Sequence, residues 1–234
     1  MDGSIRRAST RSPNRQGRWL ASAVSLGLAS QAAIVAMMFT TAAYAEDAPA
    51  VSKHDVDAKL AYCEVCHGVS AQGFHGYYPI PRLAGQQTEY LKNQLQAFVE
   101  HRRTNNIMFN VGHVLSPAMI AALAADFKDL DPKPLSGGPK DLVATGQKIF
   151  ADGIPDGKVP ACASCHGPDA KGNGPFPRLA GQLFDYVVSK LTNWDKERGQ
   201  NPAKPDESAI MEPIAHNLTG PQIKAVAAYL SYLE

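Results

Sequence analysis

The stretch Cys63-Glu64-Val65-Cys66-His67-Gly68 has a second copy in this chain, Cys162-Ala163-Ser164-Cys165-His166-Gly167. The chain has four cysteines, and all of them lie in these two Cys-x-x-Cys-His motifs. On a helical turn, positions i, i+3 and i+4 lie on one face. Both sulfurs and the histidine ring of each motif are therefore expected to face the same side, where one planar group could meet all three.

This spacing is the attachment signature of c-type haem. Two sulfurs can add to the two vinyl groups of one haem, and the adjacent histidine then stands perpendicular to the ring and ligates the iron. The two motifs predict two covalently attached haem c groups. The attaching residues are Cys63, Cys66, Cys162 and Cys165, and the first iron ligands are His67 and His166.

Other uses of Cys-x-x-Cys pairs explain less of the pattern. A zinc site with four thiolates would use both pairs, but it needs no histidine after each of them. Disulfides suit an exported chain, yet a bridge within one pair closes a loop too small to stabilise much. A thioredoxin-like redox pair belongs in a βαβ context, and the sequence shows no such pattern.

The internal repeat extends well beyond the cysteines. Residues 79–86, Pro-Ile-Pro-Arg-Leu-Ala-Gly-Gln, recur at 175–182 with seven of eight positions identical. Because the motifs follow the same order in both copies, we expect two domains of the same fold. A stretch rich in Pro and Gly separates them and suits a linker. The predicted domains are residues 46–130 and 142–234, joined by a linker at 131–141.

Each copy is predicted to be mostly helical, since apolar residues recur at helical spacing and no convincing period-2 strand appears. Ser116-Pro117 and Thr219 are typical of helix starts. Helices are expected at 88–101, from 116 to about 130, at 142–150, at 186–194 and from 219 to the C-terminus, with a weaker one at 57–62. The segments 72–79 and 195–209 are expected to be irregular loops. The predicted fold is all-α, with two tandem small domains that each wrap around a covalently attached haem.

The second iron ligand is expected from the later part of each domain. Met108 and Met211 stand at equivalent repeat positions, each after an isoleucine. A thioether favours reduced iron and raises the potential. Met side chains also fill cores, and His113 and His216 align equally well in the repeat. Met is the favoured ligand, and the two histidines remain rivals. Met119 has no counterpart and is expected in the core.

The first 45 residues are typical of a signal peptide. Basic residues end at Arg18, an uncharged segment covers 19–45, and Ala43-Tyr44-Ala45 forms a cleavage pattern. Cleavage would place the protein in the periplasm, whereas an uncleaved segment would keep it associated with the membrane. Without this segment the net charge is about −3, which disfavours a nucleic-acid partner because such binding needs a basic patch.

From about Lys59 to the end, the chain resembles small class I cytochromes c, and its tandem arrangement resembles the diheme cytochrome c4 family. The resemblance rests on both Cys-x-x-Cys-His-Gly motifs, both Pro-Arg-Leu-Ala-Gly-Gln motifs and the late Met of each half. It implies that the ligand histidines donate to the backbone carbonyls of Pro81 and Pro177. It also implies that Arg82 and Arg178 lie near haem propionates, the alternative being solvated surface charges. The tyrosines that could reach propionates or simply pack the helices are Tyr90 and Tyr186.

The expected function is transfer of single electrons between redox proteins, without catalysis. The donor would be a quinol–cytochrome c reductase or a periplasmic dehydrogenase, and the acceptor a terminal oxidase or reductase. A monomer would suffice, because both domains lie in one chain. The alternatives are an electron-accepting haem subunit of a periplasmic dehydrogenase, a diheme enzyme with an open iron, and a structural protein with metal-bound or disulfide-bonded cysteines.

Overall fold

The computed structural model describes residues 51–199, 201, 203–204 and 207–234, so the predicted signal segment lies outside the described residues. The described residues belong to one compact unit. Within its described part, the regular elements are helices, and the only β-type pairings are isolated bridges such as that between Phe74 and Ile80. The predicted all-α fold is confirmed.

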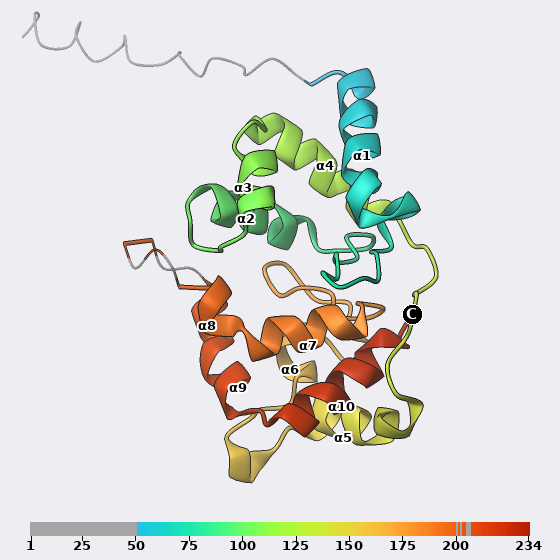
Figure 1. The fold of residues 1–234 in the computed structure, drawn as a ribbon, viewed down its shortest axis with the longest axis vertical. Helices are drawn as coiled ribbons and strands as arrows, with labels where there is room; N and C mark the ends of the chain where they lie inside the picture. The colour runs from blue at the N-terminus through green and yellow to red at the C-terminus, as the bar shows by residue number, and fades with distance from the viewer. Residues whose placement is uncertain (1–50, 200, 202, 205–206) are drawn as a thin grey trace, which may run out of the picture. The chain divides into compact units, whose positions relative to one another are not determined.

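Four α-helices build the first half (Figure 1). They are α1 (Lys53–His67), α2 (Thr88–Val99), α3 (Asn106–Gly112) and α4 (Pro117–Asp129), with a short 3-10 turn η2 (Val69–Ala71) after α1. The helix α4 packs against α1 and α2, and α3 packs against α2. Their shared core consists of Val56, Ala71, Ala84, Leu91, Met119, Leu123, Ala124 and Phe127.

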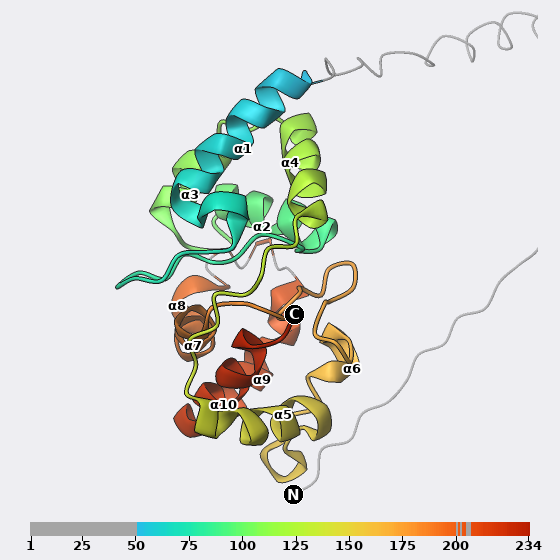
Figure 2. The same cartoon turned by 90° about the vertical axis from the view of Figure 1, so that its right-hand side faces the viewer.

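Six α-helices build the second half (Figure 2). They are α5 (Val143–Asp152), α6 (Ala163–His166), α7 (Phe184–Thr192), α8 (Trp194–Glu197), α9 (Glu212–Asn217) and α10 (Gly220–Ser231). Three 3-10 turns accompany them, η3 (Lys140–Leu142), η4 (Pro155–Gly157) and η5 (Glu207–Ile210). The helix α10 packs on α5 and α7.

The second half has a core of its own. Its largest fully buried members include Phe150, Val159 and Leu230. At the crossing of α5 and α10, Gly146 has no side chain, and a Cβ there would collide with the carbonyl oxygen of Ala225. The two helix backbones can approach closely only because this residue is glycine. Two separate cores confirm the prediction of two tandem domains.

The predicted helix starts are confirmed in atomic detail. The Ser116 hydroxyl accepts a hydrogen bond from the Met119 backbone N–H at 3.1 Å, with Pro117 at the first helical position. Thr219 and Gln222 form a reciprocal capping box at the start of α10. Both arrangements satisfy backbone N–H groups that a helix leaves without an internal partner.

Two sequence predictions need correction. The weak helix expected at 57–62 is the full-length α1, which begins after Ser52, whose hydroxyl accepts from the Asp55 N–H. Its hydrophobic pattern is faint because Val56 and His67 are its only buried residues. The segment 195–209 is not wholly irregular either, since it includes most of α8 and of η5. The short helices α3 and α9, which carry or adjoin the two Met residues, were not expected.

No single helix among the described residues is long and apolar enough to cross a membrane. One sharply bent pair, Asn106–Gly112 with Pro117–Asp129, meets the length and composition test when its two helices are taken together.

Candidate functional site

Each Cys-x-x-Cys-His motif lies at the end of a helix, the first in α1 and the second at α6. The following glycines, Gly68 and Gly167, have φ of 84° and 80°. This region of backbone conformation favours glycine, and a Cβ at Gly68 would lie 2.6 Å from the Gly73 carbonyl oxygen. The glycine therefore ends the helix and turns the chain back, so that the Gly73 N–H donates to the His67 carbonyl at 2.7 Å.

The two histidines occupy matching environments. Nδ1 of His67 lies 2.9 Å from the carbonyl oxygen of Pro81, and Nδ1 of His166 lies 2.9 Å from that of Pro177. A carbonyl oxygen only accepts, so Nδ1 of each ring carries the proton and donates it. The lone pair of Nε2 is then free to bind a metal. These are the contacts that the cytochrome c resemblance implies.

Both rings are buried, and burial favours their neutral form. It lowers the pKa of His67 and of His166, although the hydrogen bonds to the proline carbonyls act in the opposite direction. Low-dielectric surroundings disfavour the charged imidazolium. The neutral ring with Nδ1–H is the form that ligates iron through Nε2.

The structure gives no support to the alternative uses of the cysteines. No disulfide joins any of the four. In the described part of the chain, one group of His, Cys, Asp or Glu side chains is close enough to hold a metal ion, and it contains no cysteine. A single zinc site with four thiolates therefore has no support. Burial raises the pKa of the Cys63 and Cys162 thiols, as expected for sulfurs beside an apolar interior.

The methionines named as second iron ligands take equivalent places. Met108 lies in the first turn of α3, and Met211 is the residue immediately before α9. Both side chains are half-buried. Met119, by contrast, is a buried member of the first core, which confirms the role expected for it.

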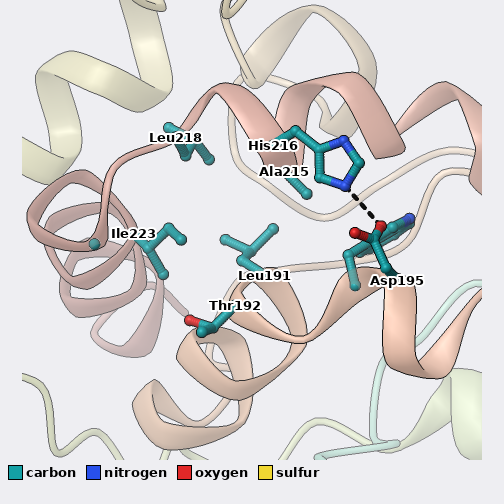
Figure 3. A pocket seen from close by; sticks show the side chains of 9 residues that line it. Leu191, Thr192, Asp195, Ala215, His216, Leu218 and Ile223 are labelled. Atoms are coloured by element: carbon teal, nitrogen blue, oxygen red, sulfur yellow. Dashed lines mark hydrogen bonds and ion pairs between the residues drawn. The ribbon is translucent and has the colours of Figure 1, made fainter.

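The two rival histidines are both exposed. His113 ends α3, where its Nδ1 donates to the Phe109 carbonyl at 3.1 Å and its ring stacks on that phenyl ring. Nε2 of His216 lies 2.6 Å from a carboxylate oxygen of Asp195 (Figure 3). This contact engages one of the two ring nitrogens of His216.

A cavity of about 300 Å³ lies beside this pair, between α7, α9 and the start of α10. Figure 3 shows Leu191, Leu218 and Ile223 around it, with His216 and Asp195 at one side. No residue of the Cys-x-x-Cys-His motifs lines it. Asp195, Glu212 and His216 are the three side chains whose ligand atoms lie close enough together to hold a metal ion, and all three are exposed.

The two motif arginines are buried, at 3% exposure for Arg82 and 7% for Arg178. The alternative of solvated surface charges is therefore wrong for both. Nη1 of Arg82 donates to the Pro132 carbonyl at 2.7 Å and Nε to the Ala84 carbonyl at 3.0 Å. Burial lowers the pKa of both guanidinium groups, and a buried cation requires compensation by an acceptor or an anion.

The protein's own acceptors do not pair every buried guanidinium nitrogen. Nη2 of Arg178 is buried without a hydrogen-bond partner and lies 3.9 Å from Asp131, beyond hydrogen-bonding range. Nε of Arg103 is likewise buried and unpaired. Such orphaned donors are rare in folded proteins. A propionate carboxylate of haem has the charge and acceptor geometry that a guanidinium requires, so the residues present fit this cofactor.

The last residue of the repeated Pro-Arg-Leu-Ala-Gly-Gln motif joins the two halves. The Gln86 amide donates to the Arg178 carbonyl at 3.0 Å and accepts from the Arg178 N–H at 2.7 Å. The Gln182 amide makes the same pair of bonds with the Arg82 backbone, at 3.1 and 2.9 Å. Each motif thus pairs with the other copy of itself, and this exchange holds both arginines at the boundary between the halves.

A second polar layer repeats this reciprocity. Nη2 of Arg103, from the first half, donates to the Tyr186 hydroxyl of the second at 2.7 Å. Arg198, from the second half, hydrogen-bonds Tyr90 of the first. Gln94 accepts from both guanidinium groups, at 2.8 and 2.7 Å. The tyrosines are therefore engaged in contacts between the halves.

Gln86→Ala is expected to destabilise the protein by about 2–3 kcal/mol, because it removes both hydrogen bonds to Arg178 and leaves a buried N–H and carbonyl of that residue unpaired. Urea unfolding, followed by circular dichroism, measures the change. Gln96→Ala, at an exposed position of α2, is the matched control and should change stability by less than about 0.5 kcal/mol. Equal effects of the two substitutions would show that the reciprocal bonds carry no net stability.

Sequence reasoning missed the residues that join the halves. Gln86 and Gln182 were visible as identical repeat positions, but their partners lie 92 and 100 residues away. Arg103 and Arg198 follow the aromatic residues that they cover, Phe98 and Trp194, in both copies. An arginine four or five residues after an aromatic residue in each copy was the signal available for this second layer.

The comparisons with known proteins agree with this geometry. The family model "Cytochrome c" matches twice, at residues 28–131 and 143–234. Cytochrome c-552 of Acidithiobacillus ferridurans is 40% identical over 206 residues, covering 86% of this chain and 84% of that protein. The "Thiosulfate dehydrogenase electron acceptor" of Thiomonas intermedia is 35% identical, over 74% of this chain and 79% of that protein.

A solved structure extends the agreement to three dimensions. The cytochrome c4 structure of Acidithiobacillus ferrooxidans superimposes with a TM-score of 0.62 at 38% identity, over 74% of this chain and 99% of that one. Two matches of one family model, two separate cores and a tandem structural relative all indicate the same architecture. The chain belongs to the cytochrome c family and, within it, to the diheme class similar to cytochrome c4.

Proposed function

We propose that this cytochrome carries single electrons outside the cytoplasm, from a quinol–cytochrome c reductase or a dehydrogenase to a terminal oxidase or reductase. The observation that carries the proposal is the matched pair of buried histidines. Each has Nδ1 held by a proline carbonyl and Nε2 free for a metal. Iron sites held by fixed side chains suit electron transfer, because ligands that stay in place in both redox states keep reorganisation small.

Two covalently attached haem c groups would be held by Cys63, Cys66, Cys162 and Cys165. Bound haem supplies an iron that gains and loses one electron. His67 and His166 would bind it through Nε2, and the proline carbonyls would keep the rings oriented. Met108 in the first domain and Met211 in the second would also bind the iron, each through its thioether sulfur. The unpaired guanidinium nitrogen of Arg178 would donate to a propionate.

With a histidine and a methionine of each domain binding the iron, neither haem would offer a place for substrate. The protein would therefore have no catalytic residue, and its partners would be other redox proteins. Residues 1–45 would direct export to the periplasm and be removed, and an uncleaved segment would hold the protein at the membrane. We further propose domain limits of 46–130 and 142–234 with the linker at 131–141, and a monomeric state.

A second, narrower function is favoured by one observation. The relative from Thiomonas intermedia is named as an electron acceptor of thiosulfate dehydrogenase, and this chain matches it over most of both lengths. The protein would then take its electrons from one dedicated dehydrogenase. This differs from the first candidate in the donor alone, since the chain's own residues would act in the same way.

Mixing the oxidised protein with thiosulfate and purified thiosulfate dehydrogenase separates these candidates. Rapid reduction of both haems would identify a dedicated acceptor, whereas reduction only by a quinol–cytochrome c reductase would support the general carrier. Carbon monoxide should bind the reduced protein poorly, because filled axial positions leave no open iron. Failure to be reduced and reoxidised by any mediator or protein would refute electron transfer altogether.

A further inference from the structure

Exposed apolar side chains are distributed unequally between the two halves. In the described part of the chain, eight of the ten large exposed hydrophobic residues belong to the first domain. Most of these lie in one stretch around the first attachment motif, which we call the 62–78 segment. They are Tyr62, Val65, Val69, Phe74, Tyr77 and Tyr78. Isolated exposed hydrophobic residues are ordinary, but such a concentration marks an interaction site.

The 62–78 segment carries one full charge, Glu64, whose carboxylate accepts a hydrogen bond from the Ser70 N–H. From Val65 to Pro81 the chain has no Asp, Glu, Lys or Arg. The repeat provides an internal comparison, because the matching residues of the second half are polar: Ser164 replaces Val65 and Asn173 replaces Phe74. The second copy also carries Asp169 and Lys171. Two domains of one fold therefore present different surfaces around the same motif.

The segment borders the first haem-attachment site. Val65 stands between the two cysteines of the motif and is 81% exposed. On the helix it projects away from the face that carries both sulfurs and the ligand histidine. After Val69, the Gly73 N–H bonds the His67 carbonyl and the Phe74–Ile80 bridge closes a loop. Figure 2 shows this loop in teal as an extended hairpin below α1.

The tip of the loop is the most exposed part of the segment. Tyr77 is 91% and Tyr78 is 80% exposed, and their rings pack edge to face with centroids 4.8 Å apart. The second copy has only Asn173-Gly174 between the positions equivalent to Gly73 and Pro79, so the two tyrosines belong to an insertion unique to the first half. Tyrosine is enriched at protein interfaces, since it offers a large apolar body with a polar end.

We propose that the 62–78 segment is the docking surface for a redox protein whose own contact face is apolar and uncharged, and that electrons enter or leave the chain through the first domain. The proposal rests on the proposed electron-transfer function. Charge complementarity selects the occupant. Beyond Glu64, a charged partner face would lose hydration against this segment without gaining an opposite charge, whereas an uncharged apolar face would bury the tyrosines and valines favourably.

The test is electron transfer between the full-length holoprotein and a blue copper protein with an uncharged apolar face over its copper. A second blue copper protein with an acidic face serves as comparison. The apolar partner should react faster, and its rate should change less than about twofold between roughly 20 and 300 mM salt, since screening weakens only charge-guided docking. Faster reaction with the acidic partner would overturn the proposal.

The double variant Val65→Ser with Tyr78→Ser should lower the second-order rate constant at least about tenfold, which corresponds to roughly 1.4 kcal/mol of lost docking free energy. Both positions are exposed, so the fold should be unaffected. Ile210→Ser makes the same chemical change at an exposed position of the second half and should leave the rate within about twofold. Equal rates for the double variant and the control would refute the docking assignment.

Two further measurements separate the outcomes. Ascorbate should reduce the double variant as fast as the unmodified protein, because a small reductant needs no docking surface. That result would leave the proposed electron-transfer function intact even if docking is lost. If even the unmodified protein is not reduced, the proposed function itself fails. Sedimentation and binding to phosphatidylcholine vesicles test the other occupants. Loss of self-association or of vesicle binding in the double variant, with unchanged electron transfer, would overturn the proposal in favour of a second copy or a lipid surface.

Discussion

A chain with Cys162→Ala and Cys165→Ala is expected to be purified with one covalent haem instead of the two proposed from its paired motifs. Without the two thioether bonds, the second domain would have no covalent link to its cofactor. Pyridine haemochrome quantification against protein concentration, together with the intact mass, measures the number of haems per chain. The loss should amount to half of the haem absorbance, the largest spectroscopic effect that we expect from any substitution.

Two control variants distinguish loss of one haem attachment from a general failure of the chain to fold. Ser164→Ala changes a residue between the same cysteines and should retain both haems. The reciprocal variant, Cys63→Ala with Cys66→Ala, should lose the first haem instead, so collapse of one domain cannot be mistaken for a general failure to fold. Two haems in either cysteine variant would contradict attachment through these motifs.

The second large effect is expected from Met108→Leu or Met211→Leu. Removing the thioether would open one iron, so the reduced protein should bind carbon monoxide, and the potential of that haem should fall by on the order of 100 mV, within the roughly 0.8 V range that axial ligands control. A redox titration followed by absorption measures the potential, and loss of the weak near-infrared thioether band identifies the ligand.

The buried Met119 offers a matched control for this experiment. It lies in the first core and has no counterpart in the repeat, so Met119→Leu should leave both potentials and the carbon monoxide behaviour unchanged. If the Met119 and Met108 variants behave alike, Met108 is not a ligand. If His113→Ala or His216→Ala alone moves a potential by the expected amount, that histidine replaces methionine as the ligand.

The parts of the site that sequence could predict are those determined by local geometry. Cys63, Cys66 and His67 lie within one helical turn, and the glycine that ends the turn follows directly. The helix starting at Pro117 was predicted for the same reason, because its cap is decided by neighbours three residues apart. Local spacing of this kind needs no knowledge of the rest of the fold.

What sequence could not provide depends on contacts between distant residues. Nothing within a few positions of Gln86 indicates that its amide would pair with the backbone of Arg178. The burial of Arg82 also depends on the linker, through the Pro132 carbonyl that accepts its hydrogen bond. The helix α1 was underestimated for a different reason, since only two of its residues are buried and its hydrophobic period is therefore weak.

The central proposal is that each half of the chain would hold one haem through a histidine and a methionine. An absorption spectrum of the exported protein, taken oxidised and then reduced with dithionite, tests it most directly when combined with pyridine haemochrome quantification. We predict two covalent haems per chain, one for each Cys-x-x-Cys-His motif, both low-spin, with a near-infrared thioether–iron band that disappears on reduction. One haem per chain, or high-spin features in either state, would contradict the account. The alternative of a diheme enzyme with an open iron would then be favoured.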